Sequence, residues 1–291
     1  MLAMFLIYGT SALASGLAWS WDKSESVKYR LETTLVAPQG QTWPAENNLV
    51  ARVTETRAKL DVDCSGALDG KLWLVTCSLG QVELSGIPLI GTEDVMKTVF
   101  KEYAAEIEGK TVSFRMGPDG KVRRFDLKGV STRNSDHGEV IDGLRQILRR
   151  AFTPFDLQLP KSGDDKGKKW SQKGSPMLFE VMTSQGTAGG VSLKHVVSAR
   201  EEDAVHIESN GRAAVVDGAT IEGGASSMIR ISAKAKSQFN TALGVLDWGQ
   251  VDTQSDHSAS NMQGLSKDGP PRFSAQIGRI GDDGAVLKPD A

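Results

Sequence analysis

The sequence predicts a mainly β protein of the α+β class, in which a large curved antiparallel sheet or half-barrel carries two amphipathic helices packed on one face. Short segments with alternating polar and apolar residues recur along the chain, which is typical of half-buried strands. The 31 glycines lie largely between such segments, as turns between strands require. Only two segments have the apolar spacing of an amphipathic helix.

The N-terminal segment, residues 1–18, is predicted to be a signal peptide, because the first charged residue of the chain is Asp22. Small residues at positions −3 and −1 of a cleavage site occur in Ala12-Leu13-Ala14 and in Gly16-Leu17-Ala18. The basic residues that usually begin a signal peptide are absent. We expect a periplasmic or secreted protein without a transmembrane span after cleavage. The alternative is a membrane tether, since about 20 apolar residues can span a bilayer.

The first strands are predicted by alternation at residues 27–36, 49–64 and 73–84, with a loop at 38–48. Asp69-Gly70 marks a turn between the second and third strands. A four-residue loop from Asp69 to Leu72 places Cys64 directly opposite Cys77, at a Cβ separation of about 4.5–5.5 Å. An exported protein meets an oxidising compartment, so we expect a disulfide between these two cysteines. Two free buried thiols are the alternative.

Two helices are predicted, at residues 92–108 and 136–152, separated by a hairpin with strands at 111–116 and 121–127. Thr92 is a suitable N-cap for the first helix, and Gly109 a suitable end. Each helix has one apolar stripe that has to be buried. These elements complete the first half of the mature protein, residues 19–160.

The remainder divides into a basic loop or linker at 161–176, an antiparallel β meander at 177–281 and a disordered tail at 282–291. Basic residues outnumber acidic ones, 14 to 8, between 115 and 173. The net charge of the whole chain is nevertheless −2, which gives no reason to expect a nucleic-acid partner. The length allows one large domain or two small ones.

No catalytic motif is present, since the chain contains neither the GxSxG elbow of serine hydrolases nor the HExxH of zinc proteases. We therefore expect no enzyme, no cofactor and no metal. His195 and His206 are close enough in the sequence to be considered as a shared metal site across a hairpin. Matching apolar residues across their hairpin places Val197 opposite Val205 and His195 opposite Ile207, so that His206 points to the other face. The two histidines are then unable to share a metal.

The order of these features resembles a family of uncharacterised bacterial extracytoplasmic proteins, many of them lipoproteins. The matching segments are the strand VKYRLE at 27–32, the DG turn within 114–122, a loop from Leu159-Pro160 to Lys169-Trp170, and the glycine-rich meander. The cysteine of a lipoprotein is absent here. In layout the chain is more distantly similar to periplasmic lipid-binding half-barrels. The resemblance implies an extracytoplasmic location and a β fold, and it assigns no functional residue.

The two helix stripes predict a ligand site, because a curved sheet can leave an apolar gap beneath them. The residues expected there are Phe100, Ile107, Leu144 and Leu148 for the apolar part, with Arg145 and Arg149 beside an anionic head group. We therefore expect a non-catalytic protein that binds a lipid or other apolar ligand. The alternative is a structural or protein-interaction module of the cell envelope, with a filled core and another envelope protein as its partner.

Overall fold

A computed structural model describes residues 17–22, 24–44, 50–90, 93–128, 147–173, 182–183, 186–187, 192–217, 227–258 and 272–288. The first half contains β1 (Val27–Pro44), β2 (Val50–Asp69), β3 (Leu72–Ile90), α1 (Glu93–Ile107), β4 (Thr111–Met116) and β5 (Val122–Lys128). Residues 147–151 are helical and lead into the short 3-10 helix η2 (Thr153–Phe155). The second half contains β6 (Lys169–Lys173), β7 (Met182–Thr183), β8 (Gly186–Thr187), β9 (Ser192–Arg200), β10 (Ala204–Asp217), β11 (Ser227–Asn240), β12 (Val245–Ser258) and β13 (Arg272–Arg279).

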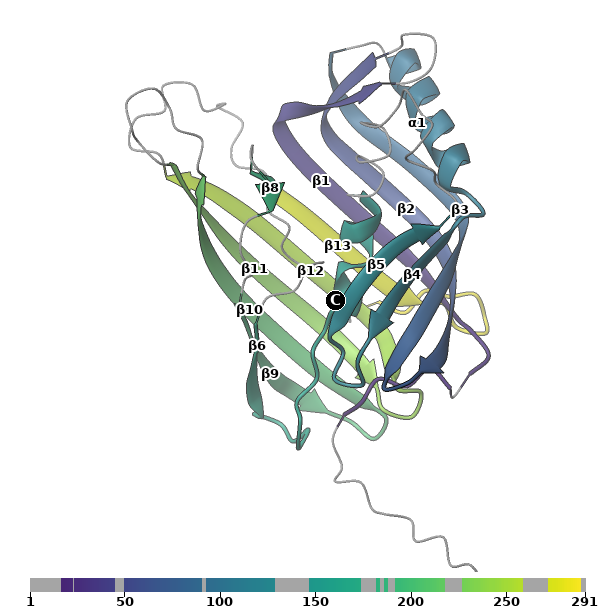
Figure 1. Cartoon of the computed structure of the whole chain (residues 1–291), viewed down its shortest axis with the longest axis vertical. Coiled ribbons are helices and arrows are strands. Elements are labelled where there is room, and N and C mark those ends of the chain that lie inside the picture. The colour runs from purple at the N-terminus through teal and green to yellow at the C-terminus, as the bar shows by residue number, and fades with distance from the viewer. Residues whose placement is uncertain are drawn as a thin grey trace, which may run out of the picture.

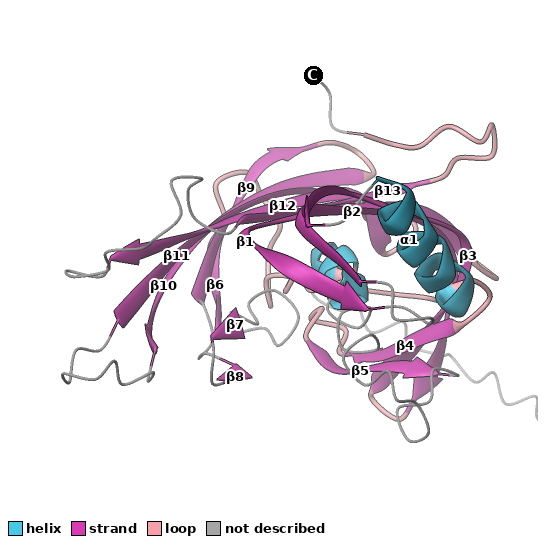
Figure 2. Cartoon of the chain, turned by 90° about the horizontal axis from the view of Figure 1, so that it is seen from above, coloured by secondary structure: helices cyan, strands magenta, loops and turns pink. Residues whose placement is uncertain are grey.

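One antiparallel sheet of 11 strands, in the order β5-β4-β3-β2-β1-β13-β12-β11-β10-β9-β6, forms the body of the molecule (Figure 1). The chain starts in the middle of the sheet, runs outward to β5, crosses to the opposite edge at β6 and returns to β13, which pairs with β1. Both halves of the sequence therefore contribute to a single sheet. The sheet curves round the central helical segment, and α1 lies on the same inner side (Figure 2). The predicted fold class is confirmed, and the sheet remains open rather than closing into a barrel.

The register of the strands shows which side chains share the inner face, because alternate residues of a strand point to opposite faces. Three neighbouring rows of directly paired residues cross this face from β9 to β3. The first inner row is Val197, Ile207, Ser237, Gly249, Ile277, Leu31, Leu60 and Val82. The second inner row is His195, Ser209, Ala235, Val251, Ala275, Thr33, Ala58 and Leu84. The third inner row is Leu193, Gly211, Ala233, Thr253, Phe273, Leu35, Thr56 and Gly86.

The hairpin of β2 and β3 has the predicted register, with Asp69 paired to Leu72 and Cys64 paired to Cys77. The two cysteines form a disulfide whose Cα atoms are 4.0 Å apart. This agreement follows from the short turn, since a fixed loop length sets the pairing of every residue in a hairpin. The bond joins neighbouring strands on the inner face, where both cysteines are buried.

The N-terminal segment 17–22 is part of the fold and closes one end of the half-barrel. The Trp19 backbone N–H donates to the Pro118 carbonyl (2.9 Å), and that of Ser20 donates to the Gly244 carbonyl (2.9 Å). The indole N–H of Trp19 donates to the Leu157 carbonyl at 3.1 Å. A Cβ at Gly120 would lie only 2.0 Å from that carbonyl oxygen, so a glycine is required there. The segment thus ties the β4–β5 turn to the β11–β12 turn.

Several boundaries differ from the prediction. The loop expected at 38–48 is a strand as far as Pro44, because β1 continues alongside β2 beyond a register shift. The basic loop at 161–176 includes the edge strand β6, which pairs with β9. The tail expected to be disordered at 282–291 folds back on β13 up to residue 288, where the Leu287 N–H donates to the Arg279 carbonyl. Of the second predicted helix, residues 136–146 lie outside the described residues.

The register of β9 and β10 also differs from the prediction. Val197 pairs with Ile207, and His195 pairs with Ser209 rather than with Ile207. The pairing begins with Val205 opposite Arg200, across a turn in which the Glu201 N–H donates to the Ala204 carbonyl, and a β-bulge then leaves Ser198 as an extra residue on β9. His206 nevertheless lies on the outer face, where its ring nitrogen is 3.1 Å from a Glu201 carboxylate oxygen.

Candidate functional site

The short helical segment 147–155 divides the inner face into two parts. On one side, it packs with α1 against β1 to β5. On the other side, η2 contacts β12 and β13, and a Cβ at Gly249 would lie 3.1 Å from the Pro154 side chain. The two sides differ in which described residues form the contiguous core, and this difference locates the candidate site.

The first side is a contiguous hydrophobic core. It includes three of the residues expected to line a ligand gap, namely Phe100, Ile107 and Leu148, all of them buried. The Phe100 ring lies over Gly86 of the third inner row, where a Cβ would be 3.1 Å from the ring. The other two expected site residues on the second helix, Leu144 and Arg145, lie outside the described residues. Arg149 is half-buried, and its carbonyl accepts a hydrogen bond from the Thr153 hydroxyl.

An aromatic cluster fills the end of the half-barrel that the N-terminal segment closes. Phe155 of η2 is at its centre, with its ring centroid 5.1 Å from that of Tyr29 and 5.6 Å from that of Phe114. Trp19 meets Phe239 edge to face at 5.3 Å. Such contacts between large rings stabilise the core beyond the area that they bury. This end of the molecule is therefore packed with protein side chains.

The second side, beneath β9 to β13, has a different inner face. Six buried apolar side chains here are not part of the contiguous core formed by the described residues. They are Leu193, Ile231, Ala233, Val251, Phe273 and Ala275. They belong to the second and third inner rows or, for Ile231, to the next position along β11. We use the name inner strip for the residues of the second and third inner rows that lie on β9 to β13, together with Ile231.

The floor of the inner strip is made of small residues. Gly211, Ala233, Ala235 and Ala275 lie in this floor together with Ser209, Val251 and Thr253. Strands are about 4.8 Å apart, so the strip from β9 to β13 is about 19 Å long. The six buried apolar residues of the strip are no more than 8% exposed, so other atoms pack above it, as the close packing of protein interiors requires.

One end of the inner strip is polar. The His195 Nδ1 lies 2.7 Å from the Ser209 hydroxyl oxygen, and the imidazole stacks on the Trp170 indole with ring centroids 5.0 Å apart. The Trp170 N–H donates to the Gln158 carbonyl, which anchors the edge strand β6. His195 is only 2% exposed. Its Nε2 is buried and has no hydrogen-bond partner among the described residues. Burial lowers the pKa of His195 to about 4, so the imidazole is neutral at pH 7.

The other end of the inner strip carries a positive charge. The Arg150 guanidinium lies over the Phe273 ring, with its carbon 5.6 Å from the ring centroid. This contact holds the cation on the side of the helical segment that faces β13. Arg150 follows the predicted Arg149 in the sequence, and the expected role of Arg149 beside a head group stays a prediction.

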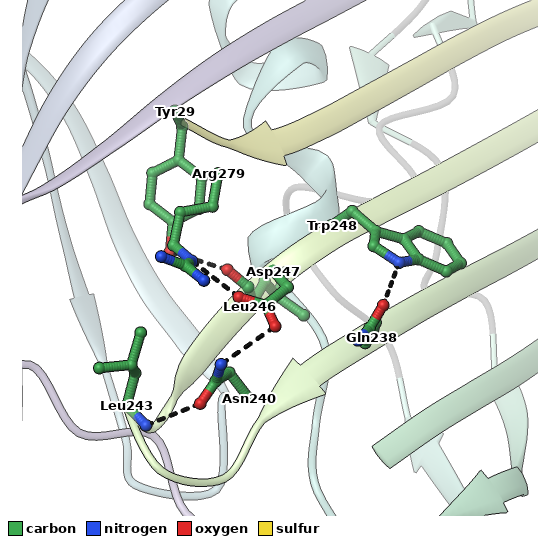
Figure 3. A network of polar contacts seen from close by, with 8 residues as sticks. All are labelled: Tyr29, Gln238, Asn240, Leu243, Leu246, Asp247, Trp248 and Arg279. Atoms are coloured by element: carbon green, nitrogen blue, oxygen red, sulfur yellow. Dashed lines mark hydrogen bonds and ion pairs between the residues drawn. The ribbon is translucent and has the colours of Figure 1, made fainter. Parts of the chain in front are cut away.

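A separate polar network joins β11, β12 and β13 near the closed end (Figure 3). One Asp247 carboxylate oxygen accepts from the Arg279 Nε–H at 2.7 Å, and the other accepts from the Asn240 amide at 3.0 Å. The Tyr29 hydroxyl donates to the Leu246 carbonyl, and burial raises the pKa of this phenol above its ordinary value. Because each of these groups is held by a partner, the network fixes the β11–β12 turn against β1 and β13.

The described part of the chain contains no group of three or more His, Cys, Asp or Glu residues arranged to hold a metal ion. No helix within the same ranges is both long enough and apolar enough to cross a membrane. Comparison with models of protein families and with curated proteins found no match.

Proposed function

We propose that this protein is a non-catalytic extracytoplasmic protein that binds a lipid along its inner strip. The observation that carries the proposal is the group of six buried apolar side chains on one face of the sheet that lie outside the contiguous core of the described residues. The strip is about 19 Å long, which is comparable to a long acyl chain. A concave, mostly apolar surface with a few polar groups is the usual form of a small-molecule site.

The positive charge of Arg150 beside the strip favours a lipid with an anionic head group. Arg150 lies over Phe273 at the β13 end, and guanidinium groups bind carboxylates and phosphates through paired hydrogen bonds. An anionic head group placed there would direct its acyl chain across β12 and β11 towards β9. The proposed ligand is therefore an anionic amphiphile with one chain in the strip. This location differs from the gap beneath both helices that the sequence suggests, because Phe100, Ile107 and Leu148 pack in the core.

Native mass spectrometry of the purified full-length protein tests the proposal, together with uptake of a dansyl-labelled fatty acid. Ala233→Phe fills the floor of the strip and should reduce dye affinity at least tenfold. Ser232→Phe is the matched control, since Ser232 is the preceding residue on the same strand and is exposed. Circular dichroism would verify that both variants fold. Absence of both co-purified lipid and dye uptake in the wild type would instead support a structural or protein-interaction module with a filled core.

A further inference from the structure

The polar end of the inner strip contains a buried nitrogen atom, Nε2 of His195, without a hydrogen-bond partner in the described chain. The His195 ring has two nitrogens, and only Nδ1 has a partner in the described chain, the Ser209 hydroxyl. A buried polar atom without a partner is rare in proteins, so each one calls for a physical explanation, such as a bound water, ion or other polar group. His195 lies on the inner face in the second inner row, and Leu193, two residues earlier on the same face, is one of the six apolar residues of the strip.

Nε2 of the neutral imidazole can either donate or accept a hydrogen bond, depending on the tautomer. If the Ser209 hydroxyl donates to Nδ1, then Nε2 carries the proton and donates; if Nδ1–H donates to Ser209, then Nε2 accepts. A hydroxyl group satisfies both arrangements, because it donates and accepts. A second carboxylate is disfavoured, since burial keeps His195 uncharged at pH 7 and no cationic side chain is in contact with it among the described residues.

We propose that Nε2 of His195 hydrogen-bonds a hydroxyl group at the far end of the lipid, so that the ligand carries an anionic group at one end and a hydroxyl at the other. This inference rests on the proposed lipid-binding function and makes it more specific. The two polar ends of the strip, Arg150 over Phe273 on β13 and His195 on β9, are four strand spacings apart, or about 19 Å. Trp170 holds the imidazole in place from the edge strand. His195 is thus a specificity-determining residue.

A pair of saturated fatty acids tests this inference: hexadecanoic acid and ω-hydroxyhexadecanoic acid, which differ only in the terminal hydroxyl. Their affinities can be measured by displacement of the dansyl-labelled fatty acid. The wild type should bind the ω-hydroxy acid about three- to tenfold more tightly, the ratio expected for one neutral hydrogen bond. The isomer hydroxylated beside the carboxyl group is the positional control and should gain nothing over hexadecanoic acid.

The variant His195→Phe keeps a flat ring next to Trp170 but removes the hydrogen-bonding nitrogen. The ratio of its affinities for the two acids is the readout, and the preference for the ω-hydroxy acid should be lost. His206→Phe, on the outer face, is the matched control and should retain the preference. Equal wild-type affinities for the two acids would overturn this inference while leaving lipid binding intact. Failure of the wild type to bind either acid would overturn both proposals.

Discussion

The buried, neutral His195 makes a measurable contribution to the pH dependence of stability. Its ordinary pKa of 6.5 falls to about 4 in the folded protein because burial penalises the charged ring. The unfolded chain therefore binds a proton between these values when the folded protein does not, so acid favours unfolding. The contribution to stability is fully present above pH 6.5 and is lost as the pH falls towards 4.

The magnitude follows from the two pKa values. A difference between 6.5 and about 4 corresponds to about 3.4 kcal/mol when the pH lies below both values, at about 1.36 kcal/mol for each pKa unit. At pH 5 the folded protein is still largely unprotonated at this site, and the loss relative to pH 7.5 is about 2 kcal/mol. This is a large fraction of the 5–15 kcal/mol that is typical of a folded domain.

Urea unfolding of the wild type, His195→Gln and His206→Gln at both pH values provides the assay. Other titrating groups also reduce stability in acid, and comparison with the variants removes their common contribution. His195→Gln should lose about 2 kcal/mol less than the wild type between pH 7.5 and pH 5. His206→Gln is the comparison variant for a histidine on the outer face, where its side chain is 23% exposed. Equal losses in the wild type and His195→Gln would refute a buried, neutral His195.

Two further predictions concern the disulfide and the N-terminal segment. Reduction of the Cys64–Cys77 bond, with a sequence separation of 13, should lower the free energy of unfolding by about 3 kcal/mol. Both thiols should resist alkylation until reduced, and ready labelling of the native oxidised protein would contradict the pairing. N-terminal sequencing of exported protein should give Ser15 rather than Trp19, because Leu17 is buried and the Trp19 N–H is bonded inside the fold. Recovery of intact Met1 from a membrane fraction would show a tether instead.

Local features of the sequence were sufficient to predict the elements whose partners are close in the chain. The hairpin of β2 and β3 has the predicted register because the Asp69–Leu72 turn fixes it. α1 has nearly the predicted bounds because its apolar stripe and Gly109 define them. In both cases the information lies within a few tens of residues, where periodicity and turn chemistry are decisive.

Contacts between distant segments were not predictable in the same way. The pairing of β1 with β13 joins the two ends of the described chain, and no local pattern specifies it. The turn between β9 and β10 and the extra residue Ser198 on β9 set the register, so matching apolar residues across an ideal hairpin gave the wrong partner for His195. Trp19 and Trp21 lie next to a segment predicted to be a signal peptide, and their burial depends on turns far away in the sequence.

The inner strip could not be predicted for a related reason. Its small residues come from β10, β11 and β13, and they form one surface only after the sheet has assembled. In the sequence, Ala233, Ala235 and Ala275 are ordinary alanines of amphipathic strands. The ligand site was instead predicted beneath the two helices, because their apolar stripes are made of large residues. Yet large side chains fill space, and it is the small ones that leave room for a ligand.

The two halves of the sheet illustrate this relation between side-chain volume and function. In the second inner row, Ala58 is followed by Leu84 on β3, and the described helices cover this part of the sheet. The row continues through Ala275 and Ala235 in the other half, where the helical segment contacts Gly249 of the first row through Pro154 and Phe273 of the third row through Arg150. Close packing requires that the space above these alanines is occupied. Arg150 at one end and His195 at the other are the two polar groups on which the proposal of an elongated ligand with two polar ends rests.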